Sequence, residues 1–259
     1  MSQEVLDSTQ YATDSILKYE QVYGEDFVAP GGKQMARELI GELNLCPGSR
    51  VLDAGCGLGG SAFLMAREFG LLVDGIDLSA NMINIAQRKL EHYGLSDRVT
   101  LTLADCMEMD KTEHYDAVYS RDVFLHISNK SSLFKVLYRC LRGDGKLLFT
   151  DYCCAEKPWQ AEFSDYVDKR GYSLHTVDSY AHLLTDAGFV NVEGTDRSER
   201  FIKTLGSEIE RINLSEIEQS VKDSLTADWQ DKIRRTEQGD HRWGLFVASK
   251  PSIKANYNG

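Results

Sequence analysis

Proline is scarce in this chain, with four in 259 residues, and the sequence contains no internal repeat and no low-complexity stretch. Rigid spacers between domains are therefore not expected. Apolar runs are short as well, and none approaches the roughly 18 residues that a membrane-spanning helix needs. A composition of 42% hydrophobic and 27% charged residues is ordinary for a globular enzyme. The length then favours one α/β domain, residues 1–259, with or without an insertion.

Cysteine pairs of the CxxC type are missing too. The six cysteines are Cys46, Cys56, Cys106, Cys140, Cys153 and Cys154, and only the last two lie close together. Zinc sites and disulfide frameworks usually need closer pairs or an extracellular context. The opening MSQEVLDSTQ has neither the basic segment nor the apolar segment of a signal peptide. We therefore expect reduced thiols, no metal site and a cytoplasmic protein.

Positive charge is in deficit, because 29 Lys and Arg stand against 40 Asp and Glu, a formal net charge of −11. Such a balance repels polyanions over long range. The chain also has no Asn-Pro-Pro-Tyr motif of the kind used on flipped bases. We therefore expect a small-molecule substrate, no nucleic-acid partner, no membrane span, and a monomer as the default state.

Short apolar runs alternate with longer amphipathic segments from Arg50 onward. We expect strands at 50–54, 71–76, 99–103, 115–119, 146–150 and 241–249, and helices at 58–69, 81–93 and 132–141. This alternation predicts an α/β fold with a doubly wound, mostly parallel sheet. Helical segments at 14–23 and 33–43 precede it, and a helical cap at 199–238 is inserted before the last strand. We divide the domain into an N-terminal helical lid (1–45), a cofactor-binding core (46–155) and an acceptor-binding part (156–259).

A glycine-rich turn, VLDAGCGLGG at 51–60, follows the first expected strand and opens a helix. Its glycines permit close backbone approach to a ligand, and Asp53 places an acceptor at the carboxyl end of the strand. Asp77 ends the next strand, where a ribose hydroxyl would be held, and Asp105 follows the third. Dinucleotide dehydrogenases use a related turn, but a carboxylate at Asp53 would repel a pyrophosphate and attract a sulfonium or ammonium.

An acceptor site is suggested beyond the fourth strand, where ligands bind in open α/β sheets. Asp122 and His126 lie one helical turn apart there and would face the same way. Tyr152 follows the fifth strand, and Tyr166, Arg170 and Tyr172 come later. Hydroxyls mixed with a guanidinium make a good receptor for a phosphate monoester.

Several segments resemble the phosphoethanolamine N-methyltransferases of plants, nematodes and malaria parasites. They include Gln10-Tyr11, Gly31-Gly32, the glycine turn, GIDLS, YSRDVFLHI, TDYC, KRGY and RWGLF, and together they span nearly the whole chain. The resemblance implies a Rossmann-like class I methyltransferase fold with S-adenosylmethionine as methyl donor and S-adenosylhomocysteine as product. It also implies N-methylation of phosphoethanolamine or its mono- and dimethyl forms toward phosphocholine, a step in phospholipid biosynthesis.

The resemblance assigns roles to residues as well. Tyr11 and His126 fall on the catalytic pair, and Asp122 on the acid near the substrate amine. The phosphate ligands fall on Tyr152, Tyr166, Arg170, Tyr172 and Lys232. The cofactor contacts fall on Gln10, Tyr19, Val28, Asp53, Gly55, Gly57, Asp77, Leu78, Asp105, Cys106 and Arg121. Val28-Ala29-Pro30 departs from relatives that carry a serine before the Gly-Gly pair, so one hydroxyl contact is missing here.

These residue types suit the chemistry. A primary ammonium has a pKa near ~10 and must lose a proton before it can attack, so a base such as His126, acting directly or through Tyr11, is useful. The phosphate gives the enzyme a handle, which Arg170 and Lys232 would grip.

Other interpretations stay open at this stage. The acceptor could be a sterol, a quinone or glycine, or the domain could bind a nucleoside without turnover. Outside the family resemblance, His126 would most often be a half-buried, hydrogen-bonded histidine, and Lys232 a solvated charge. Relatives perform all three methylation steps, only the first, or the last two, and a domain of this length can be a complete enzyme or one half of a two-domain enzyme.

Overall fold

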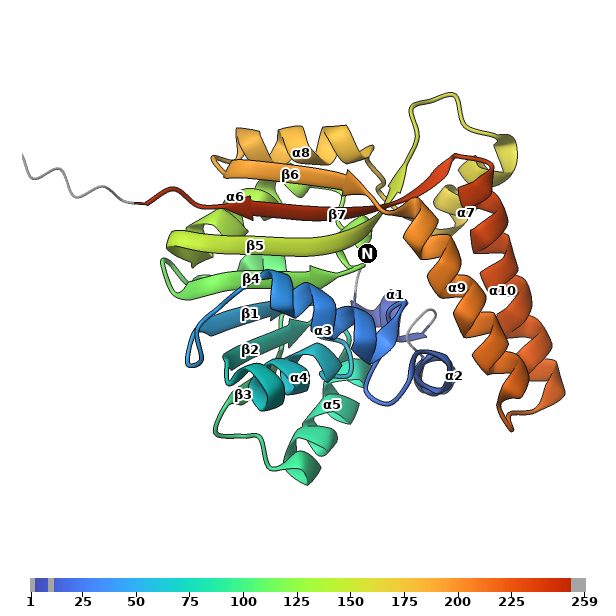
Figure 1. Cartoon of the computed structure of the whole chain (residues 1–259), viewed down its shortest axis with the longest axis horizontal. Helices are drawn as coiled ribbons and strands as arrows, with labels where there is room; N and C mark the ends of the chain where they lie inside the picture. Colours follow the sequence, from blue (N-terminus) through green and yellow to red (C-terminus); the bar gives the residue numbers. More distant parts are fainter. Residues whose placement is uncertain (1–2, 9–11, 253–259) are drawn as a thin grey trace, which may run out of the picture.

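The computed structural model describes residues 3–8 and 12–252, which form one seven-stranded sheet with helices on both faces (Figure 1). The strand order is β3-β2-β1-β4-β5-β7-β6, with β7 antiparallel to both of its neighbours and the others in the central sheet parallel. The strands are β1 (Arg50–Ala54), β2 (Leu72–Asp77), β3 (Val99–Leu103), β4 (Tyr115–Arg121), β5 (Leu141–Cys154), β6 (Val190–Asp196) and β7 (His241–Ser249). The predicted doubly wound, mostly parallel sheet is confirmed.

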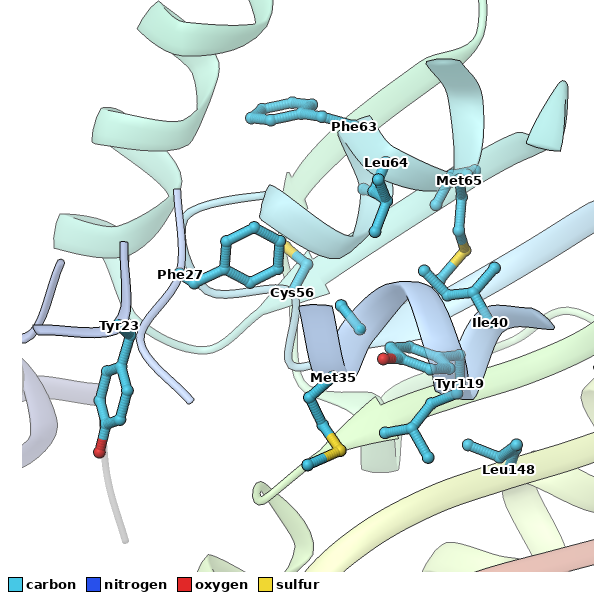
Figure 2. Packing of buried hydrophobic residues seen from close by; sticks show 14 of the residues in the cluster. Tyr23, Phe27, Met35, Ile40, Cys56, Phe63, Leu64, Met65, Tyr119 and Leu148 are labelled. Carbon is cyan, nitrogen blue, oxygen red and sulfur yellow. The ribbon is translucent and has the colours of Figure 1, made fainter. Parts of the chain in front are cut away.

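Helices cover the sheet as two separate layers. On one face α3 (Gly32–Glu42), α4 (Gly60–Phe69) and α5 (Ala80–Tyr93) pack their apolar sides onto the strands. Figure 2 shows Ile40 of α3 beside Met65 of α4 in this layer. On the other face α6 (Lys130–Cys140) and α8 (Val177–Asp186) do the same. Residues 51–54 are buried throughout, because a central parallel strand is covered on both faces.

The remaining helices gather beyond the carboxyl ends of the parallel strands. They are α1 (Gln3–Ser8), α2 (Thr13–Tyr23), α7 (Ala161–Arg170), α9 (Ser198–Leu214) and α10 (Gln219–Glu237). Figure 1 shows α2, α9 and α10 at this edge of the sheet. Trp229 of α10 is fully buried, and its ring lies 6.3 Å from the Tyr19 ring and 5.4 Å from the Tyr23 ring of α2. The N-terminal segment therefore rests on the C-terminal helix pair.

Most predicted elements are confirmed, and three of the strands have the predicted bounds (50–54, 99–103 and 241–249). The predicted helix at 132–141 begins two residues earlier, at Lys130, and ends at Cys140. The fifth strand is much longer than predicted: residues 151–154 continue its pairing with β7, and Leu141 at its start pairs with Tyr115 of β4. β6 was not predicted. Within the described residues, no helix is long and apolar enough to cross a membrane.

Candidate active site

The glycine turn between β1 and α4 is tightly folded at the carboxyl edge of the sheet. Gly55 has φ +80°, and a Cβ there would clash with the side chain of Val123. A Cβ at Gly60 would lie 2.5 Å from the carbonyl oxygen of Asp26. Glycine is needed at Gly55 for the left-handed backbone and at Gly60 for the close approach of the 24–31 loop. The sequence therefore builds a turn over which this loop can close.

A first cavity opens beside this turn, at the ends of β2 and β3. It is lined by Gly55, Ile76, Asp77, Leu78, Ala104, Asp105, Cys106, Met107, Val123 and residues 126–129. Asp77 is held in place because Oδ2 accepts from the Gly57 amide (2.8 Å) and Oδ1 from the Ser79 amide (2.9 Å). Burial raises the pKa of Asp77, and these amides oppose that shift. An oriented carboxylate between apolar walls suits a nucleoside with its ribose at Asp77.

A second cavity lies on the other side of the turn, under the 24–31 loop. Asp26, Val28, Asp53, Gly57, Arg121 and Asp122 are among its lining residues. Asp53 is buried, and its Oδ2 has no hydrogen-bond partner among the described residues. Burial raises the pKa of Asp53 to about 7, with the neighbouring Asp77 adding to the effect and Arg121 opposing it. A buried acceptor of this kind is suited to an incoming ammonium group.

Arg121 lines the second cavity, but its guanidinium donates hydrogen bonds to the lid segment at residues 30–32. Its guanidinium is buried and donates to the carbonyl oxygens of Gly32 (3.2 Å) and Pro30. These bonds tie the start of α3 to the end of β4. Arg121 therefore shapes the cavity by holding the loop in place.

A third cavity lies between the sheet edge and the C-terminal helices. Its lining residues are Tyr19, Tyr23, Val28, Pro30, Asp122, Leu125, His126, Tyr152, Tyr166, Arg170, Tyr172 and Lys232. Two of its lining residues, Arg170 and Lys232, are cations. Burial tends to lower the pKa of Arg170, but Tyr172 and Tyr166 outweigh it and raise this pKa, and the guanidinium is charged near pH 7. Burial lowers the pKa of Lys232 to about 8, and the Arg170 charge acts in the same direction. Two crowded cations among tyrosine hydroxyls form an anion receptor.

Asp122 and His126 also line the third cavity, and each of them lines a neighbouring cavity as well. Asp122 has φ +56°, and its Oδ1 accepts from Trp243 Nε1 at 2.7 Å. The His126 ring packs edge-on against the Tyr172 ring, with centroids 5.3 Å apart. Burial lowers the pKa of His126 to about 4, and the charges of Lys130 and Arg170 add to this. His126 is therefore neutral near pH 7, which a proton acceptor requires, and the lowered pKa also makes it a weaker base than a free imidazole.

The three cavities meet at shared walls. Asp122 and Val28 line both the second and the third, and His126 lines both the first and the third. Gly55, Asp77 and Val123 separate the first from the second. A ligand that fills the first and second cavities would thus have its central part next to Asp122 and His126, which also line the third cavity.

Most sequence-predicted site residues line these cavities. All six predicted substrate residues, Asp122, Tyr152, Tyr166, Arg170, Tyr172 and Lys232, lie on the wall of the third. Of the predicted cofactor residues, Gly55, Asp77, Leu78, Asp105 and Cys106 line the first cavity, and Val28, Asp53, Gly57 and Arg121 line the second. Gln10 and Tyr11 lie outside the described residues. Tyr19 was expected at the cofactor but lines the third cavity, because α2 packs it toward Trp229 and Arg170.

Several residues of the site were not expected. Tyr23, Pro30 and Leu125 complete the third cavity. Trp243 lies in the RWGLF motif, but its bond to Asp122 has no local sequence signal. Glu208 of α9 is another residue that the sequence did not predict. Its carboxylate is buried and accepts from the Gly31 amide (2.7 Å) and from Trp229 Nε1 (2.7 Å), so it joins the lid to the C-terminal helices.

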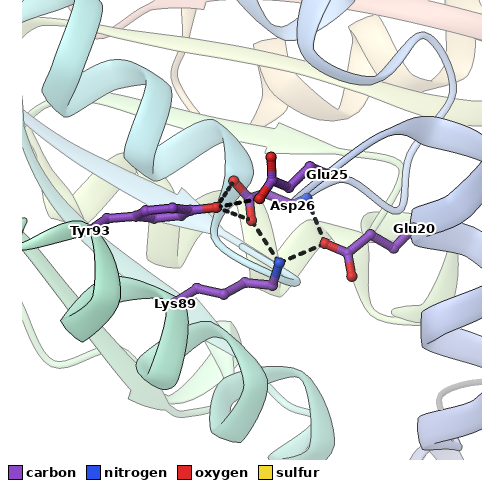
Figure 3. Close-up of polar contacts among 5 residues, drawn as sticks. All are labelled: Glu20, Glu25, Asp26, Lys89 and Tyr93. Carbon is purple, nitrogen blue, oxygen red and sulfur yellow. Dashed lines mark hydrogen bonds and ion pairs between the residues drawn. The ribbon is translucent and has the colours of Figure 1, made fainter.

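A polar cluster fastens the lid to the core (Figure 3). Lys89 of α5 bonds to Glu20 of α2 (2.6 Å) and to Asp26 of the loop (2.8 Å), and the Tyr93 hydroxyl reaches Glu25 (3.0 Å) and Asp26 (3.1 Å). Burial alone would lower the pKa of Lys89, but the hydrogen bonds to Asp26 and Glu20 have the larger effect, so the pKa of Lys89 is raised. The loop over the second cavity is therefore held closed by charge.

The N-terminus of α5 provides a second attachment for the lid. Asp7 of α1 accepts from the Ser79 hydroxyl and from the Ala80 amide (3.2 Å). A carboxylate at a helix N-terminus is favourable because free amides and the helix dipole meet it there. Among the described residues, no group of three or more His, Cys, Asp or Glu side chains could hold a metal ion.

Comparison with known proteins shows which family and which structures this chain resembles. The family model described as mycolic acid cyclopropane synthetase matches residues 29–239. Phosphoethanolamine N-methyltransferase 1 of Arabidopsis thaliana is 41% identical over 96% of this chain and 52% of its own length. The phosphoethanolamine N-methyltransferase of Plasmodium falciparum (isolate 3D7) is 34% identical over 95% of both chains.

A solved structure is similar over the same span. It is the Haemonchus contortus phosphoethanolamine N-methyltransferase 2 in complex with phosphomonomethylethanolamine and S-adenosylhomocysteine. The TM-score is 0.92 at 33% identity, covering 96% of this chain and 60% of the other. The chain described here thus spans about half the length of the Arabidopsis relative and 60% of the nematode one.

Proposed function

This chain belongs to the phosphoethanolamine N-methyltransferases, within the wider family of the mycolic acid cyclopropane synthetase model, and on that premise we propose that it N-methylates phosphoethanolamine or its mono- and dimethyl forms with S-adenosylmethionine. The strand order and the 0.92 TM-score confirm the predicted class I methyltransferase fold. Substrate and donor are inferred for this chain from its site residues and from its relatives.

The observation that carries the proposal is the polarity of the third cavity. Arg170 and Lys232 line it together with five tyrosines, while Asp122 and His126 lie where the donor cavities meet it. A phosphobase has a dianionic phosphate at one end and an amine two carbons away. Arg170 and Lys232 suit the phosphate, and Asp122 suits the ammonium.

The first two cavities fit the proposed methyl donor. Asp77 is oriented for a ribose, and the unpartnered buried oxygen of Asp53 is available to an ammonium. When bound, the donor would supply a methyl group on a positively charged sulfur. The work of this chain is then to align the amine nitrogen with that methyl and to exclude water beneath the lid.

We assign the following roles on this basis. Arg170, Lys232 and the tyrosine hydroxyls bind the phosphate, and Asp122 orients the ammonium. The neutral His126 takes the proton that the amine must lose, directly or through Tyr11. Residues 1–45 act as lid, 46–155 bind the donor, and 156–259 bind the phosphate end.

Oligomeric state and compartment form a further part of the proposal. We propose a monomer as the default state. All six cysteines are free, which supports a reducing compartment such as the cytoplasm. Size-exclusion chromatography with light scattering tests the first, because a stable dimer would contradict it.

Methyl transfer can be tested directly. The purified chain is incubated with methyl-labelled S-adenosylmethionine and, separately, with phosphoethanolamine, its monomethyl form and its dimethyl form, and the products are identified by mass spectrometry. We expect label in at least one phosphobase and much less in ethanolamine, which lacks the phosphate. Label in none of the three, with donor binding intact, would overturn the proposal.

A further inference from the structure

A buried lysine lies directly behind the segment that carries His126. Lys130 is the first residue of α6 and is 2% exposed. Its ammonium donates to the backbone carbonyl oxygens of Phe124 (3.0 Å), Ile127 (2.8 Å) and Ser173 (2.5 Å). Lys130 does not line any of the three cavities, so it has no direct part in binding.

The position is unfavourable for a lysine by itself. A cation at the start of a helix opposes the helix dipole, and burial removes its hydration. Burial lowers the pKa of Lys130 to about 8, and Asp151 opposes this shift. Three carbonyls and the ring of Tyr180, whose centroid is 5.5 Å from Nζ, offset the cost. A helix N-terminus does not need such a residue, so a local role in capping does not explain it.

The three carbonyls belong to two segments of the site, and the site needs a fixed distance between these segments. Phe124 and Ile127 bracket the short helical turn at Phe124–His126, whereas Ser173 directly follows Tyr172. A second bond joins the same segments, because the Ser173 amide donates to the Leu125 carbonyl (2.8 Å). One ammonium thus links the turn that carries His126 to the segment that carries a phosphate-end tyrosine.

The support behind Lys130 is polar and fully buried. Asp151 is inaccessible to solvent and accepts a hydrogen bond from the Tyr180 hydroxyl. Burial raises the pKa of Asp151 to about 7, and the Lys130 charge opposes this. Each charge therefore makes the other less costly inside the protein.

We propose that Lys130 is a positioning residue for methyl transfer: its ammonium fixes the spacing between His126 and Tyr172, and so between the amine end and the phosphate end of the acceptor cavity. This inference rests on the proposed function and on the proton-accepting role of His126. It predicts that the effect of Lys130 on turnover passes through His126.

A double-mutant cycle tests that prediction. Lys130→Met keeps the packing of the side chain but removes the ammonium, and it is made in the parent chain and in His126→Ala. We expect kcat to fall between about tenfold and about a hundredfold in the parent, as for a small displacement of a reacting group, and less than about twofold in His126→Ala. Equal losses in both backgrounds, or no loss in the parent, would overturn the inference.

Lys250→Met is the matched control. Lys250 is also buried, donates to a backbone carbonyl (Leu141, 2.7 Å) and lies over a tyrosine ring (Tyr138, 4.8 Å), but it does so at the opposite end of β5. We expect a similar drop in Tm with kcat unchanged. A comparable loss of kcat in Lys250→Met would show that general destabilisation explains the Lys130 result.

Two further measurements keep the test decisive. If Lys130→Met does not fold, Lys130→Gln, whose amide still donates a hydrogen bond, replaces it in the same cycle with the same two criteria. If the parent chain methylates no phosphobase, the proposed function fails, and the NMR signal of the His126 ring then decides. The chemical shift of that signal, assigned with His126→Ala, should change in the Lys130 variant and stay the same in Lys250→Met. An unmoved signal would overturn the positioning role.

Discussion

Trp243 Nε1 donates a hydrogen bond to Asp122 Oδ1 at 2.7 Å, and this bond connects the antiparallel strand β7 to the residue that follows β4. Trp243 is itself buried and stacked on Phe201, with ring centroids 5.6 Å apart. Asp122 stands at the wall shared by the second and third cavities. The carboxylate that faces the proposed reaction centre is thus aimed by a side chain from the far part of the sequence.

Removing this donor should misplace Asp122. We expect Trp243→Phe to lower kcat/KM for the phosphobase by about tenfold, since a hydrogen bond to a charged group contributes about 1.5–3 kcal/mol. Trp159→Phe is the control, because that indole donates to the Ala155 carbonyl instead (2.8 Å). Steady-state kinetics together with a thermal melt of both variants separate function from stability. Equal kcat/KM in the two variants would contradict the role of the bond.

Arg170 should act on the acceptor and not on the donor. We expect Arg170→Met to lower kcat/KM for the phosphobase by about a hundredfold or more, because a charged phosphate loses a two-pronged partner in a partly buried site. The Kd for S-adenosylhomocysteine, measured by calorimetry, should stay within about twofold. Lys169→Met, at the neighbouring exposed position, should leave both quantities unchanged. Full activity of Arg170→Met would remove the phosphate assignment.

Asp53 should make donor binding depend on pH. Burial raises its pKa to about 7, so below pH 7 the carboxyl gains a proton and loses its attraction for an ammonium. We expect the Kd for S-adenosylmethionine to rise by up to about tenfold between pH 7.5 and pH 6.0 in the parent, the limit for one linked proton over this interval being of that order. Asp53→Asn should bind weakly at both values with a flatter profile. A parallel profile in the two proteins would contradict the assignment.

The lid cluster should affect donor affinity through loop closure. In Lys89→Met, Glu20 and Asp26 lose their shared cation, and we expect the Kd for S-adenosylhomocysteine to rise about threefold to tenfold, equivalent to about 1 kcal/mol. Lys33→Met, which loses only an exposed ion pair with Glu68 (3.6 Å), is the control. Calorimetry on both variants gives the comparison. The lid would not depend on Lys89 if the two Kd values were the same.

His241 should make the fold sensitive to acid. It is fully buried beside Tyr152 and Tyr166, and burial lowers its pKa to about 3. In the unfolded chain a histidine titrates near ~6.5, so as the pH falls below this value only the unfolded form takes up the proton. The free energy of unfolding then falls by about 2 kcal/mol between pH 7.5 and pH 5.0 because of this group alone.

The prediction is a smaller pH effect when the ring is removed. We expect the difference in Tm between pH 7.5 and pH 5.0 to shrink by several degrees in His241→Leu. His182→Leu, at an exposed position, should keep the difference of the parent. An unchanged difference in His241→Leu would mean that this histidine does not titrate on unfolding as inferred.

The sequence predicts the central sheet well because its strands are buried on both faces. Residues 51–54 are buried throughout, with only Asp53 polar among them, and a glycine-rich turn follows directly. β6 gives no such signal. Its residues are mostly exposed, and it is a strand because β7 offers an edge to pair with. Pairing with a distant segment is not encoded in local periodicity.

The same distinction holds for the site. Asp77 could be placed because it ends a strand that runs beside β1, so its position follows from the topology. Lys232 lies in a charged stretch typical of a solvated helix face, and only the packing of α10 brings it to Arg170. The bonds of Trp243 to Asp122 and of Glu208 to Gly31 join residues more than a hundred positions apart. No single-sequence pattern reports such contacts.

A crystal structure of the chain with phosphoethanolamine and S-adenosylhomocysteine tests the central claim most directly. We predict phosphate oxygens within hydrogen-bond distance of Arg170 and of at least one tyrosine among Tyr152, Tyr166 and Tyr172. The amine should lie between Asp122 and the sulfur of the nucleoside. A phosphate bound outside the third cavity, or an amine turned away from Asp122, would contradict the account.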